Sequence, residues 1–113
     1  MNIQIFGKAK CFDTKKAERF FKERRIKYQA IDLPRYGISK GELKSVIQAV
    51  GGIDKLLNPK APDAAVITHL AYEEDKAEKL LENPSVLLTP IVRSGKRATV
   101  GFQPDVWQRW MEL

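Results

Sequence analysis

Cys11 is the only cysteine of the chain and the first residue in it whose chemistry could support a reaction. It follows a polar loop and precedes a charged, amphipathic segment, so we expect it to stand where a helix begins. Helix N-termini stabilise a thiolate through backbone N–H groups and the helix dipole, and Lys8, Lys10, Lys15 and Lys16 would add a cationic field. A thiolate attacks disulfides and oxyanions. The alternative is a small buried cysteine that serves packing, but its position and polar flanks favour a reactive thiol.

Thr14 stands three residues after Cys11, at the spacing of a C-x-x-C motif without the second thiol. A threonine cannot resolve a disulfide, but its hydroxyl can hydrogen-bond the Cys11 sulfur. Asp13 would raise the pKa of the thiol, and we interpret it as a residue that stabilises the helix start. Further along, Thr89-Pro90 precedes a predicted strand, and an X-Pro bond adopts the cis form at small cost. A cis bond there would present backbone groups to an extended thiol substrate.

The length and composition narrow the class of protein. The 113 residues fit one domain, 1–113, and 43% hydrophobic with 30% charged residues is a globular balance. No apolar run approaches the roughly 20 residues of a membrane span, and residues 1–4 are not typical of a signal peptide. We therefore expect a cytoplasmic protein without a membrane role. One cysteine and one histidine, His69, argue against a disulfide framework and a metal site, and we expect no tightly bound cofactor.

The positive charge is concentrated near the start of the chain. Residues 8–27 hold nine basic and three acidic side chains and so account for the whole net charge of +6. A basic helix over 13–25 could bind a protein partner. Aromatic residues do not interleave with the basic ones as a nucleic-acid stacking surface requires, so nucleic acid is not a favoured partner.

Hydrophobic periodicity predicts the elements that position these residues. A strand over 2–6, a helix over 13–25 and a strand over 26–33 form a βαβ unit with parallel strands. Ser39 and Glu42 form a capping box for a helix that ends at Gly51-Gly52. Beyond it we expect a short helix near 53–57, a loop over 58–62, a helix over 72–82, a hairpin of 90–93 with 98–100, and a last helix from Pro104.

This order predicts an α/β, thioredoxin-like fold. It has a four-stranded mixed sheet with two inner parallel strands, a terminal hairpin and a closing helix, and a helical insertion over about 36–86. His69, Trp107 and Trp110 are interpreted as structural residues, the tryptophans covering the sheet.

Three short motifs occur in the order known from one protein family. Cys11-x-x-Thr14-Lys15-Lys16-Ala17, Thr89-Pro90-Ile91-Val92 and Val100-Gly101-Phe102 resemble the bacterial arsenate reductase/Spx (ArsC-like) family, and Leu57-Asn58-Pro59-Lys60-Ala61-Pro62 is similar to its nitrogenase-associated branch. The resemblance implies a thioredoxin-like fold, Cys11 as the catalytic thiol and Pro90 as a cis-proline facing it. In arsenate reductases this thiol attacks arsenate and is recycled by glutathione and glutaredoxin. Spx-type members carry a C-x-x-C switch and bind RNA polymerase.

The chain departs from the family pattern at two positions. Arsenate reductases have arginines where this chain has Asn58 and Thr89. Without these guanidinium groups arsenate loses bidentate charge neutralisation, and Arg93, Lys96 and Arg97 on the hairpin are not evident substitutes. The missing second cysteine also removes the Spx-type switch.

Three hypotheses follow. In the first, the protein is a monothiol oxidoreductase in which Cys11 attacks a mixed disulfide or an oxyanion. Glutathione is then a co-substrate, a small thiol or a glutaredoxin-type protein is a partner, and the substrate contacts are Lys8, Lys10, Thr14, Lys15, Thr89 and Pro90. In the second, the same scaffold is a non-catalytic interaction or regulatory module that binds a protein through the basic segment 13–25. The third, arsenate reduction, requires another cationic cluster in place of the missing arginines.

Overall fold

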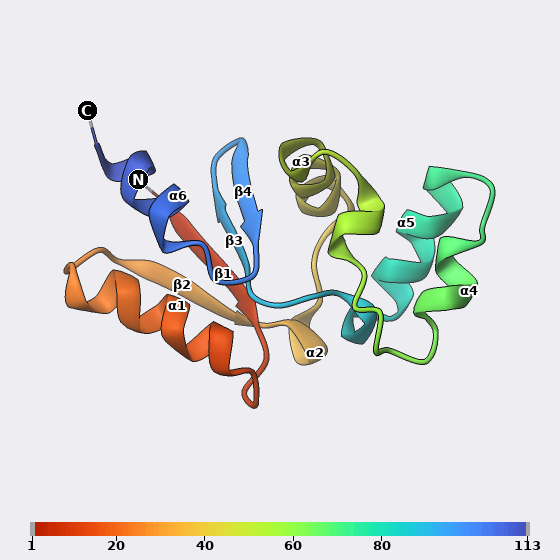
Figure 1. Cartoon of the computed structure of the whole chain (residues 1–113), viewed down its shortest axis with the longest axis horizontal. Helices are drawn as coiled ribbons and strands as arrows, with labels where there is room; N and C mark the ends of the chain where they lie inside the picture. Colours follow the sequence, from red (N-terminus) through yellow and green to blue (C-terminus); the bar gives the residue numbers. More distant parts are fainter. Residues whose placement is uncertain (1, 113) are drawn as a thin grey trace.

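The computed structural model describes residues 2–112 and contains one four-stranded mixed sheet of order β2-β1-β3-β4 (Figure 1). Strand β1 (Ile3–Gly7) pairs in parallel with β2 (Tyr28–Asp32) and antiparallel with β3 (Ile91–Ser94), and β3 forms a hairpin with β4 (Arg97–Val100). The predicted parallel βαβ unit and the terminal hairpin are therefore confirmed.

The prediction of two inner parallel strands is wrong for one of them. Strand β1 is inner, but β2 lies at the edge of the sheet, and its Gln29, Ala30 and Asp32 are exposed. A βαβ unit fixes that two strands are neighbours and parallel, but not which of them receives the next strand. Here β3 adds to β1, which is apolar enough to be buried on both faces.

One face of the sheet is covered by α1 (Phe12–Glu23) and α6 (Pro104–Met111). Trp107 is fully buried at the centre of this layer, and its indole N–H donates to the Thr99 hydroxyl at 2.8 Å. Trp110 packs at the rim of the same cluster, so the structural role predicted for both tryptophans fits their positions. The buried residues of this layer are Ile3, Ile5, Ala17, Phe20, Phe21, Val92 and Trp107.

The opposite face packs against the middle of the chain, where α3 (Lys40–Val50) is closest to the sheet (Figure 1). The predicted capping box starts this helix: the Ser39 hydroxyl accepts from the Glu42 N–H at 3.1 Å, and the Ser39 N–H donates to the Glu42 carboxylate at 3.0 Å. The helix ends at Gly51, whose φ of 87° is in the left-handed region that favours glycine.

The rest of this middle segment differs in detail from its prediction. Leu33 and Pro34 begin a short helix, because proline fits the first turn of a helix and ends a strand. A five-residue helix after Pro62 also escaped prediction, since it has too few turns to show a periodicity. The further elements are α2 (Leu33–Tyr36), η1 (Ile53–Leu56), α4 (Ala64–Thr68), α5 (Glu73–Glu82) and η2 (Pro84–Val86).

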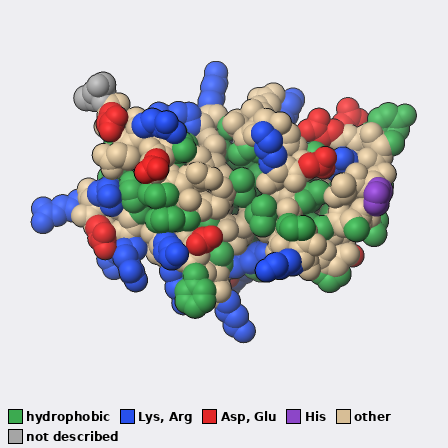
Figure 2. Space-filling view, in the orientation of Figure 1, with side chains coloured by type: hydrophobic (Ala, Val, Ile, Leu, Met, Phe, Trp, Pro, Cys, Tyr) green, Lys and Arg blue, Asp and Glu red, His purple; other side chains and the backbone are tan. Residues whose placement is uncertain are grey.

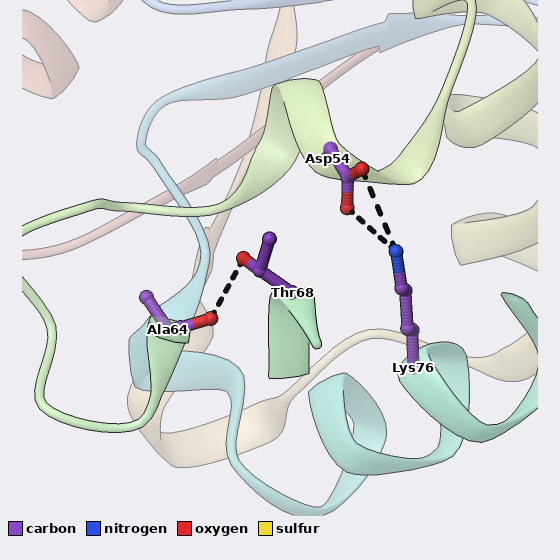
Figure 3. Close-up of polar contacts among 4 residues, drawn as sticks. All are labelled: Asp54, Ala64, Thr68 and Lys76. Atoms are coloured by element: carbon purple, nitrogen blue, oxygen red, sulfur yellow. Dashed lines mark hydrogen bonds and ion pairs between the residues drawn. The ribbon is translucent and has the colours of Figure 1, made fainter. Parts of the chain in front are cut away.

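A polar contact joins α5 to η1, and another lies within α4 (Figure 3). The Lys76 ammonium of α5 donates to both Asp54 carboxylate oxygens of η1, at 3.1 and 3.5 Å, and the Thr68 hydroxyl donates to the Ala64 carbonyl at 2.8 Å. His69 is exposed at the end of α4, away from the sheet. Within residues 2–112 no helix is both long enough and apolar enough to cross a bilayer.

Candidate functional site

Cys11 is the N-cap residue of α1, as its place in the sequence predicted. Its backbone is extended, its N–H donates to the Lys8 carbonyl at 3.0 Å, and its own carbonyl accepts from the Lys15 N–H at 3.3 Å. The side chain makes no capping bond and is half-buried. The sulfur therefore lies beside the first N–H groups of the helix, which have no acceptor within the helix.

Thr14 is buried directly below the thiol, and Gly7 makes room for it. Its side chain is 6% exposed, and its hydroxyl oxygen accepts from the Lys8 N–H at 3.4 Å. A Cβ atom on Gly7 would overlap the Thr14 side chain. A glycine at the end of β1 thus lets Thr14 pack against the strand and place its hydroxyl near the sulfur.

The Thr89–Pro90 peptide bond is cis, as the family resemblance implies, and it lies opposite Cys11. The Cys11 thiol donates to the Thr89 carbonyl with an S···O distance of 3.6 Å. The Pro90 carbonyl in turn accepts from the Gly101 N–H at 2.9 Å, which fastens the segment after β4 to the same place. Cys11, Thr14, Thr89 and Pro90 are therefore brought together.

Two opposing effects set the pKa of Cys11. Partial burial is the larger single effect and raises the pKa of the thiol. Hydrogen bonds from the Thr14 and Thr89 side chains and from the backbone N–H groups of Thr14 and Asp13 lower it, and together they outweigh burial, so the pKa lies below its ordinary value. The thiol's own bond to the Thr89 carbonyl favours the neutral form and is lost on deprotonation, since a carbonyl only accepts. Neutral donors rather than lysine charges favour the thiolate.

The lysines near Cys11 are directed to different places. The Lys8 ammonium donates to the carbonyls of Ser85 at 2.9 Å and Leu87 at 3.3 Å, so it holds the turn that leads into Thr89-Pro90. Lys16 lies 4.0 Å from the Asp13 carboxylate. Lys10 and Lys15 are exposed. Lys8 is thus bound to backbone, whereas Lys10 and Lys15 remain at the surface beside the site.

A cavity of about 260 Å³ adjoins the site between α1 and the end of β2. Three of the predicted substrate contacts, Lys8, Thr14 and Lys15, line it, and Glu18 and Asp32 contribute acidic groups to its wall. Its mixture of charges fits a zwitterionic ligand such as a peptide.

Two phenylalanines near the site escaped prediction. Phe12 follows the thiol directly and is 78% exposed, and Phe102 is 38% exposed with the Lys16 ammonium 5.7 Å from its ring centre. The sequence held a signal for Phe12, because the buried face of α1 consists of Thr14, Ala17, Phe20 and Phe21 and position 12 lies outside it. An exposed aromatic ring beside a nucleophile offers apolar contact to a substrate.

The positions of the missing family arginines hold no cation. The side-chain oxygen of Asn58, Oδ1, accepts from the Lys60 backbone N–H at 3.0 Å and so stabilises the turn over residues 58–60. The hairpin arginines lie elsewhere: Arg93 donates to Gln4 at 2.7 Å, and Arg97 lies over the Trp110 ring. Within residues 2–112 no three metal-ligating side chains come together either.

Comparison with known proteins supports this architecture. The chain is 30% identical over 110 residues to the global transcriptional regulator Spx 2 of Oceanobacillus iheyensis, covering 93% of this chain and 80% of that protein. No protein-family model matches the chain.

Solved structures share its fold. An arsenate reductase from Vibrio cholerae superposes with a TM-score of 0.84 at 19% identity, over 96% of this chain and 97% of that one. The glutaredoxin-like NrdH-redoxin of Escherichia coli superposes with a TM-score of 0.52 at 17% identity, over 100% and 99% of the two chains. The predicted thioredoxin-like fold is therefore confirmed. With the Spx relative, the cysteine at the helix start and the cis-proline opposite it, the chain belongs to the arsenate reductase/Spx (ArsC-like) family.

Proposed function

We propose that this protein is a monothiol oxidoreductase that reduces mixed disulfides with glutathione as the reductant. The observation that carries the proposal is the half-buried Cys11 at the start of α1. Burial raises its pKa, but hydrogen bonds from the Thr14 and Thr89 side chains and from backbone N–H groups lower the pKa below its ordinary value. A lowered pKa increases the thiolate fraction at neutral pH, and the thiolate is the nucleophile in disulfide exchange.

The proposed reaction uses two thiols, that of Cys11 and that of free glutathione. The Cys11 thiolate attacks the glutathione sulfur of a protein–glutathione disulfide, an S–S bond to Cys11 forms, the original S–S bond breaks, and the released thiolate takes a proton from water. A glutathione thiolate then attacks the glutathione sulfur bound to Cys11, which releases oxidised glutathione and regenerates the Cys11 thiolate. Because the chain has no second cysteine, the second thiol must come from another molecule.

The surroundings of Cys11 support binding of such a substrate. The thiol lies against the Thr89–Pro90 segment, and the adjoining cavity presents Lys15 together with Glu18 and Asp32 to a carboxylate and the amine of a glutathione moiety. Lys8 also lines this cavity, but its ammonium would have to leave the Ser85 and Leu87 carbonyls to contact the ligand. Lys10 and Lys16, which are exposed near Cys11 in the sequence, are proposed as further cationic contacts. A reduced thiol that depends on glutathione requires a reducing compartment, so we also propose a cytoplasmic location.

The test is reduction of a glutathionylated peptide by excess glutathione, followed as release of the free peptide thiol. Cys11→Ser changes one atom at a half-buried position, so it should retain the melting temperature and lose all turnover above the uncatalysed rate. Lys96→Gln, on the far hairpin, is the matched control and should be fully active. Turnover in Cys11→Ser equal to that of the wild type would reject the proposal.

A second candidate is a regulatory module that binds a protein partner. The outer face of α1 carries exposed Lys15, Lys16, Arg19 and Lys22, and Figure 2 shows Lys and Arg side chains gathered over this end of the molecule. The Oceanobacillus relative is named a transcriptional regulator, which is compatible with this reading.

Purified RNA polymerase, the partner that the resemblance implies for Spx-type members, distinguishes the two candidates. Binding that survives Cys11→Ser and is lost in Lys15→Glu/Lys16→Glu would support the regulatory module. Binding that depends on Cys11 but not on the two lysines would contradict it.

Arsenate reduction is the least supported of the three functions, because neither position 58 nor position 89 of this chain is an arginine. We expect no arsenate-dependent turnover with glutathione and glutaredoxin.

A further inference from the structure

A row of polar side chains crosses the sheet at the end away from Cys11. Gln4 of β1 lies opposite Gln29 of β2 on one side and opposite Arg93 of β3 on the other. All three share the sheet face of Phe6 and Ile91, because they stand two residues from Phe6, Ile31 and Ile91 on their strands. The row thus continues the apolar face of the sheet with an arginine and two amides.

Arg93 is a half-buried cation without a neutralising partner. One terminal nitrogen of its guanidinium, Nη1, donates to the Gln4 side-chain oxygen at 2.7 Å, and its Nε–H is buried without a hydrogen-bond acceptor. No carboxylate of residues 2–112 forms an ion pair with it. Burial of a charge is costly unless the charge is paired. The second terminal nitrogen, Nη2, also has no hydrogen-bond partner among the described residues but is not buried, so it is the donor that an oxyanion outside the sheet can reach.

The charge of Arg93 acts on the carboxylate of Glu42, but both oxygens of that carboxylate are hydrogen-bonded to other residues. Burial raises the pKa of Glu42. Hydrogen bonds from the Ser39 N–H and hydroxyl, a hydrogen bond from Gln4 and the charge of Arg93 lower it and together outweigh burial, so the pKa lies below its ordinary value. One carboxylate oxygen accepts from Ser39 in the capping box of α3 and the other from Gln4 at 3.4 Å. Moving it onto Arg93 would uncap the helix.

A cavity of about 640 Å³ opens beside this row. Its wall includes Arg93 and the exposed Lys27, the amides of Asn2, Gln4 and Gln29, and Gly95 at the hairpin turn, and no acidic side chain. Two cations and three amides around an open space without a carboxylate are complementary to a negatively charged, hydrogen-bonding ligand. We call this space the Arg93 groove.

We propose that the Arg93 groove binds a small organic anion through a carboxylate or phosphate group that is held by the Arg93 guanidinium and by Lys27. The bound oxyanion supplies the counter-charge that Gln4, a neutral partner, does not. The site lies beyond the end of β1 opposite to Cys11 and is independent of the thiol chemistry.

The experiment is an NMR titration of the wild-type protein with inorganic phosphate and, separately, with citrate, each against sodium chloride of equal ionic strength. We expect saturable shifts of the Arg93 Nε–H signal and of the Gln4 and Gln29 side-chain amides. Whichever probe binds more tightly identifies the oxyanion class. Absence of saturable shifts with both probes would overturn the proposal.

Matched arginine variants locate the binding. Arg93→Gln should weaken the better probe by about tenfold or more, because a charge-assisted hydrogen-bonded pair is lost. Arg97→Gln, which removes an arginine over Trp110 on the neighbouring strand, should bind as the wild type does. Equal loss in both variants would show non-specific attraction to the basic protein and would overturn the proposal.

Two further variants guard against a folding defect. If Arg93→Gln unfolds, the exposed Lys27→Gln still tests the groove and should weaken binding severalfold. Cys11→Ser should bind the anion unchanged, so failure of this proposal and failure of the thiol mechanism are distinguishable. Unchanged affinity in Lys27→Gln and in a folded Arg93→Gln would refute the assignment.

Discussion

Strand β1 has a different ionisable group near each of its ends. After Gly7 comes the Cys11 thiol, whose charge appears only on deprotonation and is stabilised by the neutral donors of Thr14 and the helix backbone. Beside Gln4 lies the permanent charge of Arg93, which meets a neutral amide. The anion at one end is satisfied within the protein, whereas the cation at the other is not. The thiolate has hydrogen-bond donors within the protein and Arg93 has no counter-charge, so we expect substitutions at the two places to change activity, binding and stability differently.

Gly7→Ala should have the largest effect at the Cys11 end. The added methyl group overlaps Thr14, and crowding of a packed interior costs about 1–3 kcal/mol in the free energy of unfolding. Thr14 must move, so the mixed-disulfide activity should fall as well. Denaturant unfolding and the peptide assay measure the two effects. Gly41→Ala is the control, because a Cβ there meets no atom and alanine favours the helix, so it should be neutral or stabilising.

Gln4→Glu sharpens the contrast at the other end by supplying the missing counter-charge. The new carboxylate would pair with Arg93, and we expect affinity for the titrated anion to fall about tenfold. Stability should rise by no more than about 1 kcal/mol, because Glu42 lies close enough to repel it. The NMR titration and thermal unfolding measure these changes, and Gln29→Glu is a weaker comparison at the sheet edge. Undiminished anion binding in Gln4→Glu would show that the ligand does not depend on the free charge of Arg93.

Thr14→Val removes a hydroxyl from below the thiol without changing the shape of the side chain. Loss of this donor should raise the pKa of Cys11, so the thiolate fraction at pH 7 decreases and iodoacetamide alkylation slows severalfold. The pH profile of alkylation should move to higher pH. Thr14→Ser retains the hydroxyl and should retain the wild-type profile. Coincident profiles for all three proteins would mean that the backbone donors and the Thr89 side chain activate the thiol without the Thr14 hydroxyl.

Glu42→Gln should give the smallest effect and one that depends on pH. The pKa of Glu42 is lowered in the folded state, so its contribution to stability is present above the pKa of an unfolded glutamate and is lost as the pH falls through the folded value. Glutamine can also complete a capping box, so we expect a cost below about 1 kcal/mol at neutral pH. In strongly acidic solution the two proteins should unfold at the same denaturant concentration. A difference that persists there would assign the effect to packing.

Much of the Cys11 site was predictable because its signals are local. A cysteine between a strand and an amphipathic helix, a threonine three residues later and an X-Pro pair before a strand are each recognised from a few consecutive residues, although the X-Pro pair lies far from the cysteine in sequence. The directions of the lysines were not predictable in this way. Lys8 donates to carbonyls 77 and 79 residues away, and no nearby residue signals that contact.

The Arg93 groove carried no local signal at all. An arginine in a short hairpin next to a glycine turn has the pattern of a solvent-exposed strand end. It became a half-buried, unneutralised cation because β3 adds to β1, which brings Arg93 to Gln4 across 89 residues of sequence.

The sequence by itself determined the elements whose causes are short-range: the parallel βαβ unit, the capped helix from Ser39, the hairpin and the cysteine at a helix start. Only the tertiary structure decided that β2 is an edge strand, that Thr89 meets Cys11 78 residues away and that Arg93 lies beside an amide rather than a carboxylate. The physical reason is that propensities and caps act within a few residues, whereas strand order and register are set by which distant apolar faces can be buried together.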